Sequence, residues 1–272
     1  MPELPEVETT KRGLIPHVEG KRVAGVRIGN PMLRWPIPEN LHEEVSGATI
    51  LGISRRAKYL LFDLGRGKLI VHLGMSGSLR YLESAAEPEK HDHFDLLFSD
   101  GSLIRLRDPR RFGAVLWEKG EIGAHPLIRG LGVEPLGEGF SGRLLYDLSR
   151  GKSVAVKQYV MDSRIVVGVG NIYASESLFR AGISPMVSAG KVGASRYERL
   201  AEEIRNTLND AILAGGSTLR DFVNSSGNPG YFQQRLNVYG RAGEPCPVCS
   251  TPVKQARQGQ RSTFYCPKCQ KC

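Results

Sequence analysis

The sequence predicts an α+β protein with several domains: a β-sandwich preceded by a helix, a helical domain and a small zinc-binding β-hairpin. Short β-rich runs separated by Gly, Asp and Ser fill residues 22–116, a spacing typical of a sandwich. Apolar residues then recur at four-residue steps over 200–212, as they do on one face of a helix. All five cysteines follow residue 240. A chain of 272 residues can hold two domains and an appendage.

These patterns set the domain boundaries. We expect a β-sandwich domain over residues 1–130, a linker over 131–150, a helical domain over 151–240 and a zinc finger over 241–272. The linker is placed by a Gly- and Pro-rich passage from Gly130 to Gly142, because these residues favour turns over regular structure.

The first element is a short helix over residues 3–14. Leu4, Val7 and Leu14 fall on one face of it, and the glutamates at its start suit the positive end of the helix dipole. Four β-rich runs then stand out before the linker. They are Tyr59–Leu64, Leu69–Leu73, Phe94–Phe98 and Leu103–Leu106.

The helical domain contains the clearest periodic segment. Ser195 and Glu198 match a capping box, in which a hydroxyl and a carboxylate satisfy the first backbone donors of a helix. Gly215 and Gly216 end the pattern, as glycines often do after a helix. The apolar face between them consists of Leu200, Ile204, Leu208 and Ile212.

The cysteines predict a structural zinc site. Two Cys-x2-Cys pairs separated by 16 residues have the spacing of a four-cysteine zinc ribbon. One zinc ion bound by four thiolates has no open position for catalysis. Two disulfides are the alternative, but they are rare in cytoplasmic chains, and so short a segment needs a metal to fold. The ligands would be Cys246, Cys249, Cys266 and Cys269, with Cys272 left as a free thiol.

Positive charge is concentrated in the second half of the chain. The net charge is +9, and residues 1–150 hold 21 Lys and Arg against 20 Asp and Glu, whereas residues 151–272 hold 16 against 8. Such a surface attracts polyanions, nucleic acid first and an acidic membrane surface second, although a solubilising surface explains the charge equally well. Lys254, Arg257 and Arg261 lie between the cysteine pairs and suit phosphates.

The sequence carries no sign of a membrane segment or of export. No apolar run approaches the ~20 residues that a membrane helix needs. The N-terminus lacks the basic, apolar and small-residue order of a secretory signal. We expect a cytoplasmic protein.

The second residue is a proline. A Pro in this position favours removal of the initiator Met, which would leave the secondary amine of Pro2 as the chain terminus. Such an amine titrates near ~8, so an appreciable fraction of it is neutral and nucleophilic at physiological pH. Pro is also a common choice at the start of a helix for purely structural reasons. Position alone therefore leaves both roles open.

Six motifs stand in register along the whole chain: the opening Met1–Thr9 segment, Arg55–Leu60, His72–Gly77, Asp108–Gly113, Gly168–Glu176 and the cysteine ribbon. Together they resemble the motifs of bacterial formamidopyrimidine-DNA glycosylases. The resemblance implies a β-sandwich domain with catalytic residues, a helix-two-turn-helix domain that binds DNA, and a zinc finger. It also implies base excision repair: removal of oxidised purines such as 8-oxoguanine and formamidopyrimidines from duplex DNA, followed by β,δ-elimination at the abasic site.

The resemblance assigns catalytic roles to four residues. Pro2 would attack C1′ of the damaged nucleotide and form a Schiff base, which acts as an electron sink for elimination. Glu3 would serve as the acid and base at the sugar or the leaving base, although a carboxylate there also suits the helix dipole. Lys58 would bridge the amine and the DNA phosphates, on a β-like run between Arg56 and Tyr59. Arg261 would hold a phosphate beside the lesion, and Glu6 would support the site.

The resemblance also implies DNA contacts. Extruding a base leaves a hole in the duplex that something must fill, and Met and Phe are suitable wedges while Arg can contact the orphaned cytosine. These roles fall to Met75, Phe112 and Arg110. The resemblance assigns phosphate or other DNA contacts to His72, His91 and Asn171. It assigns purine preference to the loop 216–231, which contains Arg220 where some relatives have Lys.

Two other functions remain open at this point. A sister glycosylase for oxidised pyrimidines shares the terminal Pro and the zinc finger, but it typically opens with Pro-Glu-Gly-Pro, whereas this chain opens with Pro-Glu-Leu-Pro. A non-catalytic zinc-containing DNA-binding protein would leave Pro2 inert. The expected partner is double-stranded DNA with oxidised purines. We expect a monomer, one zinc ion, no small-molecule cofactor and no membrane contact, in the bacterial cytoplasm at the nucleoid.

Overall fold

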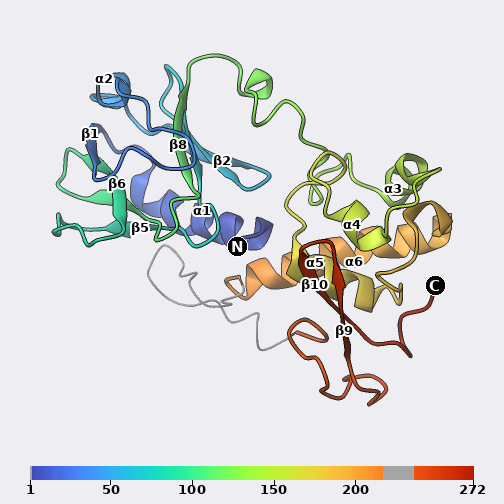
Figure 1. Cartoon of the computed structure of the whole chain (residues 1–272). Helices are drawn as coiled ribbons and strands as arrows, with labels where there is room; N and C mark the ends of the chain where they lie inside the picture. The colour runs from blue at the N-terminus through green and yellow to red at the C-terminus, as the bar shows by residue number, and fades with distance from the viewer. Residues whose placement is uncertain (1, 217–235) are drawn as a thin grey trace. The chain divides into compact units, whose positions relative to one another are not determined.

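The computed structural model describes residues 2–216 and 236–272, which form two compact units (Figure 1). The first unit contains residues 2–129 and 214–216, and the second contains 130–213 and 236–272. Arg220 and the loop beyond Gly216, to which the resemblance assigns purine preference, lie outside the described residues. No helix within the described ranges combines the length and the apolar character needed to cross a membrane.

The first unit is the predicted β-sandwich. It has two four-stranded antiparallel sheets, in the strand orders β1-β6-β7-β5 and β2-β3-β4-β8. The strands run from blue to green in Figure 1. Their bounds are β1 Val23–Ile28, β2 Gly52–Arg56, β3 Tyr59–Asp63, β4 Lys68–His72, β5 Ser78–Leu82, β6 Asp92–Phe98, β7 Leu103–Arg107 and β8 Ala114–Glu118; α2 is Leu41–Val45 and the 3-10 turn η1 is Ile122–Ala124.

The core of this unit forms along short apolar runs in the strands. Leu60 pairs with Val71 and Phe62 pairs with Leu69 across β3 and β4, and all four are buried in the same cluster. Because successive side chains of a strand point to opposite faces, this register directs one apolar row inward. The other sheet contributes Phe94, Leu96, Phe98, Ile104 and Leu106 to the cluster.

Helix α1 (Leu4–Val18) opens the first unit and packs against β2, β3 and β5. Its start is a capping box in which the Glu3 N–H donates to Glu6 Oε2 at 2.8 Å. The helix extends one turn beyond the predicted end at Leu14. The reason is that Val18 is fully buried in the core, so continuing the helix removes another apolar side chain from water.

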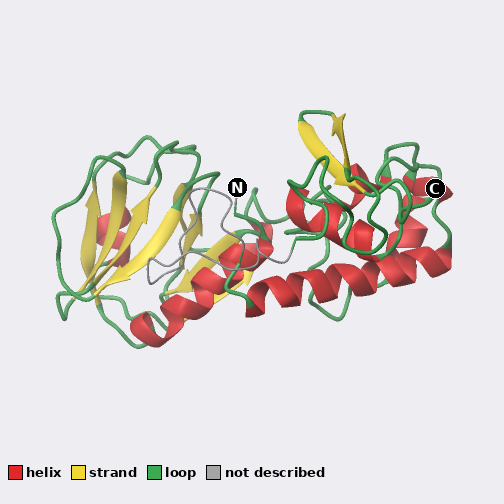
Figure 2. Ribbon diagram, turned by 90° about the horizontal axis from the view of Figure 1, so that it is seen from below, coloured by secondary structure: helices red, strands yellow, loops and turns green. Residues whose placement is uncertain are grey.

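The second unit is helical and ends in a hairpin. Its long helix α6 (Ala194–Leu213) confirms the predicted periodic segment, and the four predicted apolar residues are buried. It begins before Ser195, because the Tyr197 N–H already donates to the Gly193 carbonyl at 3.1 Å, so Ser195 lies inside the helix and does not cap it. Figure 2 shows α6 as the longest helix. The other elements are α3 Gly142–Ser149, α4 Val156–Val160, α5 Asn171–Arg180, η2 Ala189–Lys191, β9 Lys254–Gln258 and β10 Arg261–Tyr265.

The passage 131–150, expected as a linker, contains helix α3. Ser141 caps this helix by accepting the Leu144 N–H at 3.1 Å. A Cβ at Gly142 would lie 2.3 Å from the Cα of Glu198 in α6, so glycine at this position lets the two helices approach closely. A glycine that suggests a linker in the sequence therefore serves helix packing in the structure.

Candidate functional site

The predicted nucleophile and acid lie together at the buried start of α1. Pro2 is buried, and Glu3 and Glu6 are only 3% and 2% exposed. A Cβ at Gly216 would lie 3.3 Å from Glu6 Oε1, so the chain passes close to this carboxylate. A terminal amine next to a carboxyl group that is shielded from water is suited to nucleophilic attack with proton transfer.

Lys58 lies in a turn and not on a strand. Ala57 and Lys58 form the two-residue turn that joins β2 to β3, and Ala57 adopts a left-handed φ of 53°. Short antiparallel hairpins need such a backbone, because it matches the twist of the paired strands. The expectation of a strand position for Lys58 was wrong for this reason. At the tip of the hairpin the lysine is partly exposed.

His72 ends β4 and is held in one neutral form. Its Nδ1 accepts the Gly74 N–H at 3.0 Å, and its ring centroid lies 4.9 Å from that of Tyr59. Burial, with the positive charges of Lys58 and Arg34, lowers the pKa of His72 to about 4. Because Nδ1 accepts, the ring proton is on Nε2. His72 can therefore donate a hydrogen bond to a phosphate without carrying charge.

We predict that His72 stays neutral through the physiological range. Its pKa in the folded state, about 4, lies below the ~6.5 of an unfolded chain. The side chain therefore contributes stability above pH ~6.5 that is lost as pH falls towards 4. Titration followed by 15N NMR, with a His72→Gln variant to assign the signals, should show a ring that protonates only below pH ~5. A ring that titrates near 6.5 would contradict the prediction.

Four residues predicted to contact DNA line one pocket of about 700 Å³ in the first unit. These residues are His72, Met75, Arg110 and Phe112, and the remaining lining comes from Met32, Leu33, Arg34, Gly74 and Arg111. Met75 and Phe112 are 40% and 42% exposed, so they are not core residues. The Arg110 guanidinium lies 4.9 Å from the centre of the Phe112 ring, within cation–π range. Exposed apolar side chains beside arginines suit insertion into a base stack.

The loops that carry these wedge residues are locked together by close backbone contact. Gly74 has a φ of 65°, and a Cβ there would lie 2.5 Å from the Gly113 nitrogen. A Cβ at Gly113 would in turn lie 2.7 Å from the His72 carbonyl oxygen. Fully buried Asp108 accepts the Gly113 N–H at 2.7 Å. Rigid support of this kind fixes side chains that must meet DNA in one geometry.

We expect Gly74→Ala to destabilise the first unit by about 2–4 kcal/mol, since it adds overlap to backbone strain. The matched control is Gly101→Ala, because Gly101 has a similar φ of 87° but nothing within 4 Å of its added Cβ. The control should lose only about 1 kcal/mol, from backbone strain. Denaturant unfolding of both variants measures the difference. Equal losses would show that the loops do not depend on this contact.

His91 contributes to the same loops through its backbone. Its carbonyl accepts the Asp108 N–H at 2.9 Å, and its partly buried ring lies edge-on to that of His93. The ring does not line the pocket of Met75 and Phe112. A direct contact between the His91 side chain and DNA stays a prediction.

In the second unit Asn171 is the first residue of α5 and lies in a polar cluster. Its Oδ1 accepts from Lys157 Nζ at 2.6 Å, and its Nδ2 donates to the Ser262 carbonyl at 3.0 Å. Lys157 is only 1% exposed and also donates to Thr263 Oγ1 at 2.8 Å. The sequence did not predict a role for Lys157, because no motif or spacing marks a buried lysine in α4. The cluster joins α4, α5 and β10.

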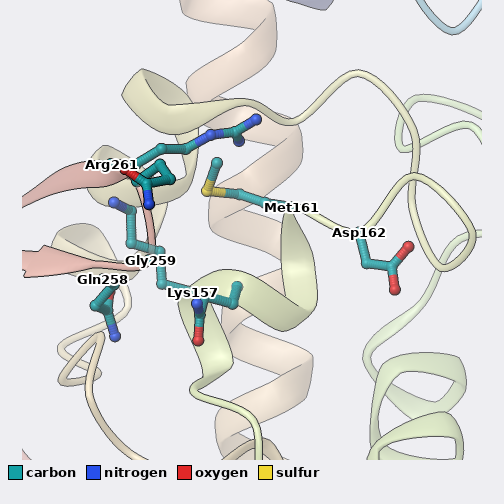
Figure 3. Close-up of a pocket in the computed structure, with 8 residues that line it drawn as sticks. Lys157, Met161, Asp162, Gln258, Gly259 and Arg261 are labelled. Atoms are coloured by element: carbon teal, nitrogen blue, oxygen red, sulfur yellow. The ribbon is translucent and has the colours of Figure 1, made fainter.

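Arg261 is the first residue of β10 and is exposed. It lines a pocket of about 340 Å³ with Lys157, Met161 and Asp162. Figure 3 shows the Arg261 side chain extended beside Met161, with Lys157 below the hairpin turn. A guanidinium that is free to face solvent next to a polar cluster suits a phosphate.

The four predicted cysteine ligands form a metal site. Their sulfur atoms all lie within 4.8 Å of one another, with Cys246 to Cys269 at 3.9 Å and Cys249 to Cys266 at 3.5 Å. Zn–S bonds of about 2.3 Å in a tetrahedron place sulfurs about 3.8 Å apart. The donor set and its spacing fit one structural zinc ion. The fifth cysteine, Cys272, is exposed and outside this group.

Comparison with known proteins gives matches over nearly the whole chain. Three family models match: the formamidopyrimidine-DNA glycosylase N-terminal domain over residues 1–115, the formamidopyrimidine-DNA glycosylase H2TH domain over 131–223, and a zinc finger found in FPG and IleRS over 243–271. The formamidopyrimidine-DNA glycosylase of Burkholderia multivorans is 58% identical over 276 residues and covers 100% of both chains.

Solved structures agree in fold. A variant of the Lactococcus lactis protein in complex with Fapy-dG containing DNA has a TM-score of 0.91 and 36% identity, covering 100% of both chains. The wild-type Lactococcus lactis protein in complex with oxidized pyrimidine containing DNA has a TM-score of 0.90 and 36% identity over the same coverage.

Proposed function

This chain belongs to the formamidopyrimidine-DNA glycosylase family, and from this membership we infer how its residues act on DNA. It is a bifunctional enzyme of base excision repair, a DNA glycosylase and AP lyase. Its partner is double-stranded DNA that contains oxidised purines, on which it acts as a monomer. We place it in the bacterial cytoplasm, at the nucleoid.

The reaction begins at the amine of Pro2. The lone pair of the nitrogen forms a bond to C1′ of the damaged nucleotide, the glycosidic bond breaks, and its electrons leave with the base, to which Glu3 directs a proton. The amine then loses its proton, the C1′–O4′ bond breaks as O4′ takes up a proton, and the opened sugar is left as an iminium, which acidifies the 2′-proton. Loss of that proton expels the 3′ phosphate, and a second elimination expels the 5′ phosphate. Lys58, His72, Asn171 and Arg261 hold the phosphates beside the lesion.

The pocket of Met75, Arg110 and Phe112 is the observation that carries the proposed mode of substrate recognition. Two large apolar side chains stay exposed beside arginines, on loops locked by Gly74 and Gly113. A hydrophobic core gains nothing from such an arrangement. An enzyme that extrudes a base needs it, because the gap in the stack costs a few kcal/mol when it is left empty.

Covalent trapping tests the proposal. Purified protein is incubated with a duplex carrying one 8-oxoguanine opposite cytosine, with sodium borohydride present, and cross-linked peptides are analysed by mass spectrometry. We expect a reduced adduct on an N-terminal Pro2. Intact DNA binding with no adduct on this duplex would instead indicate the non-catalytic DNA-binding alternative or a different lesion.

Oxidised pyrimidines are a second candidate substrate class. The structure of the Lactococcus lactis relative with oxidized pyrimidine containing DNA makes this class worth testing. The Pro-Glu-Leu-Pro opening of this chain favours purines. Single-turnover excision from matched duplexes, one with each type of lesion, should be faster for the purine.

A further inference from the structure

Glu8 is a buried carboxylate in α1 that binds three cations. Its Oε1 contacts Lys11 Nζ at 2.8 Å and Arg12 Nε at 3.0 Å, and its Oε2 contacts Arg55 Nε at 2.9 Å. Burial alone would raise the pKa of Glu8, but hydrogen bonds from Lys11, Arg55 and Arg12 outweigh it and lower the pKa to about 2. Glu8 is therefore charged at physiological pH.

Arg55 connects this carboxylate to the turn that carries Lys58. Its side chain is 9% exposed. While its Nε bonds to Glu8, its terminal nitrogen donates to the Ala57 carbonyl at 2.9 Å. Ala57 is the turn residue with the left-handed φ of 53°, a conformation that costs free energy for a residue with a side chain. The second hydrogen bond of Arg55 holds the peptide group that leads directly into Lys58.

The same contacts also involve the helix that follows the proposed nucleophile, Pro2. Glu8 is on α1, the helix that starts directly after Pro2 and Glu3, and α1 packs against β2 and β3. The path Glu8, Arg55 and Ala57 is thus a direct polar connection between the helix of the amine and the turn of the lysine. A planar guanidinium is suited to this connection because its N–H donors point in fixed directions within one plane, so it can bind two acceptors at once.

We propose that Glu8 and Arg55 are positioning residues, which set the location of Lys58 relative to the Pro2 amine through the hydrogen bond to the Ala57 carbonyl. This inference rests on the proposed function, since Pro2 and Lys58 have their roles from it. Reacting groups displaced by about 1 Å can lose up to about 100-fold in rate. A modest shift of this turn therefore has a measurable effect on chemistry.

Arg12 is a matched control. It binds the same carboxylate but is 59% exposed, and its described hydrogen bond is to Glu8, on its own helix. If Glu8 and its cations matter only for the charge balance of α1, changing Arg12 and Arg55 should have similar effects. If the path to Ala57 matters, only Arg55 should affect the reaction.

The experiment measures single-turnover borohydride trapping on duplex DNA with one abasic site, at saturating enzyme. We expect Arg55→Lys to slow trapping about tenfold, with DNA affinity little changed. Arg12→Ala should stay within about twofold of wild type, as expected for an exposed ion pair. In a Lys58→Ala background, Arg55→Lys should have less than about a twofold effect, because residues that act through one another are not additive.

Glu8→Gln serves as a second variant, since it keeps one acceptor oxygen, replaces the other with an NH2 donor, and loses the charge that holds Arg55. Glu8→Gln should slow trapping when Lys58 is present and have little effect in the Lys58→Ala background. Thermal unfolding checks that each variant is folded. Equal slowing by Arg55→Lys in both backgrounds, or no slowing in either, would overturn the inference while wild-type trapping leaves the proposed function intact. Failure of the wild type to be trapped would overturn both.

Discussion

Glu3→Gln is expected to slow removal of 8-oxoguanine by about 1,000-fold while the variant still cleaves DNA at a preformed abasic site. General acid–base groups contribute about 100- to 10,000-fold to such reactions, and an amide cannot deliver a proton to the leaving base. At an abasic site the base is already gone. The variant therefore separates the two steps that the proposed mechanism assigns to one site.

The structure explains why this substitution should leave the fold intact. The backbone N–H of Glu6 donates to the side chain of Glu3, and the side chain of Glu6 accepts the Glu3 N–H in return. A glutamine retains a carbonyl oxygen for the first of these bonds. It loses the interaction of the negative charge with the helix dipole, which is worth about 0.3–1 kcal/mol. A loss of activity would therefore not follow from a loss of helix α1.

The measurement is single-turnover excision on an 8-oxoguanine duplex, run beside elimination on an abasic duplex with the same enzyme preparation. The second reaction is the internal control for folding and DNA binding. Excision within about threefold of wild type would assign Glu3 to the capping box alone, because a general acid contributes far more than this.

Sequence patterns predicted the elements whose periodicity matches their burial. Helix α6 and the strands β3 and β4 are of this kind, because the apolar face of α6 is buried and each strand is a short apolar run that is buried in the sandwich. The zinc site follows equally from spacing, since four thiolates in two short loops determine their own geometry. The motif residues Met75 and Phe112 were also predicted, but on resemblance. As isolated Met and Phe residues they would be assigned to a core.

Features that depend on close approach between distant residues were not predictable. Gly142 was taken for a linker residue because composition does not reveal that α3 packs on α6 within reach of a Cβ. Lys58 was placed on a strand because the left-handed turn at Ala57 involves no glycine. Buried polar groups were missed for a related reason. Nothing local marks Lys157 as interior, because its partners Asn171, Ser262 and Thr263 come from other parts of the chain.

Removal of zinc should have the second large effect. Cys249→Ala is expected to lower affinity for lesion-containing duplex DNA by at least about 100-fold, because a structural zinc ion supplies most of the folding free energy of such a finger. The described contacts show what is lost with it. Lys157 and Asn171 both bond to Ser262 or Thr263 in β10, so a disordered hairpin releases Asn171 as well as Arg261.

Arg261→Ala removes one proposed phosphate contact and leaves the zinc site of the finger unchanged. That variant keeps the hairpin and should lose a smaller factor in affinity for DNA, with the salt dependence of binding reduced by about one charge.

Cys272→Ala is the matched cysteine control, since this thiol is exposed and outside the four-sulfur cluster. This variant should bind DNA as wild type does. Binding curves at several salt concentrations, with wild-type protein stripped by a chelator and then reloaded with zinc, complete the comparison. If Cys249→Ala lost no more affinity than Arg261→Ala, the finger would contribute to DNA binding only through the charge of Arg261. Lys157 and Asn171 would then keep their positions without the zinc-bound hairpin.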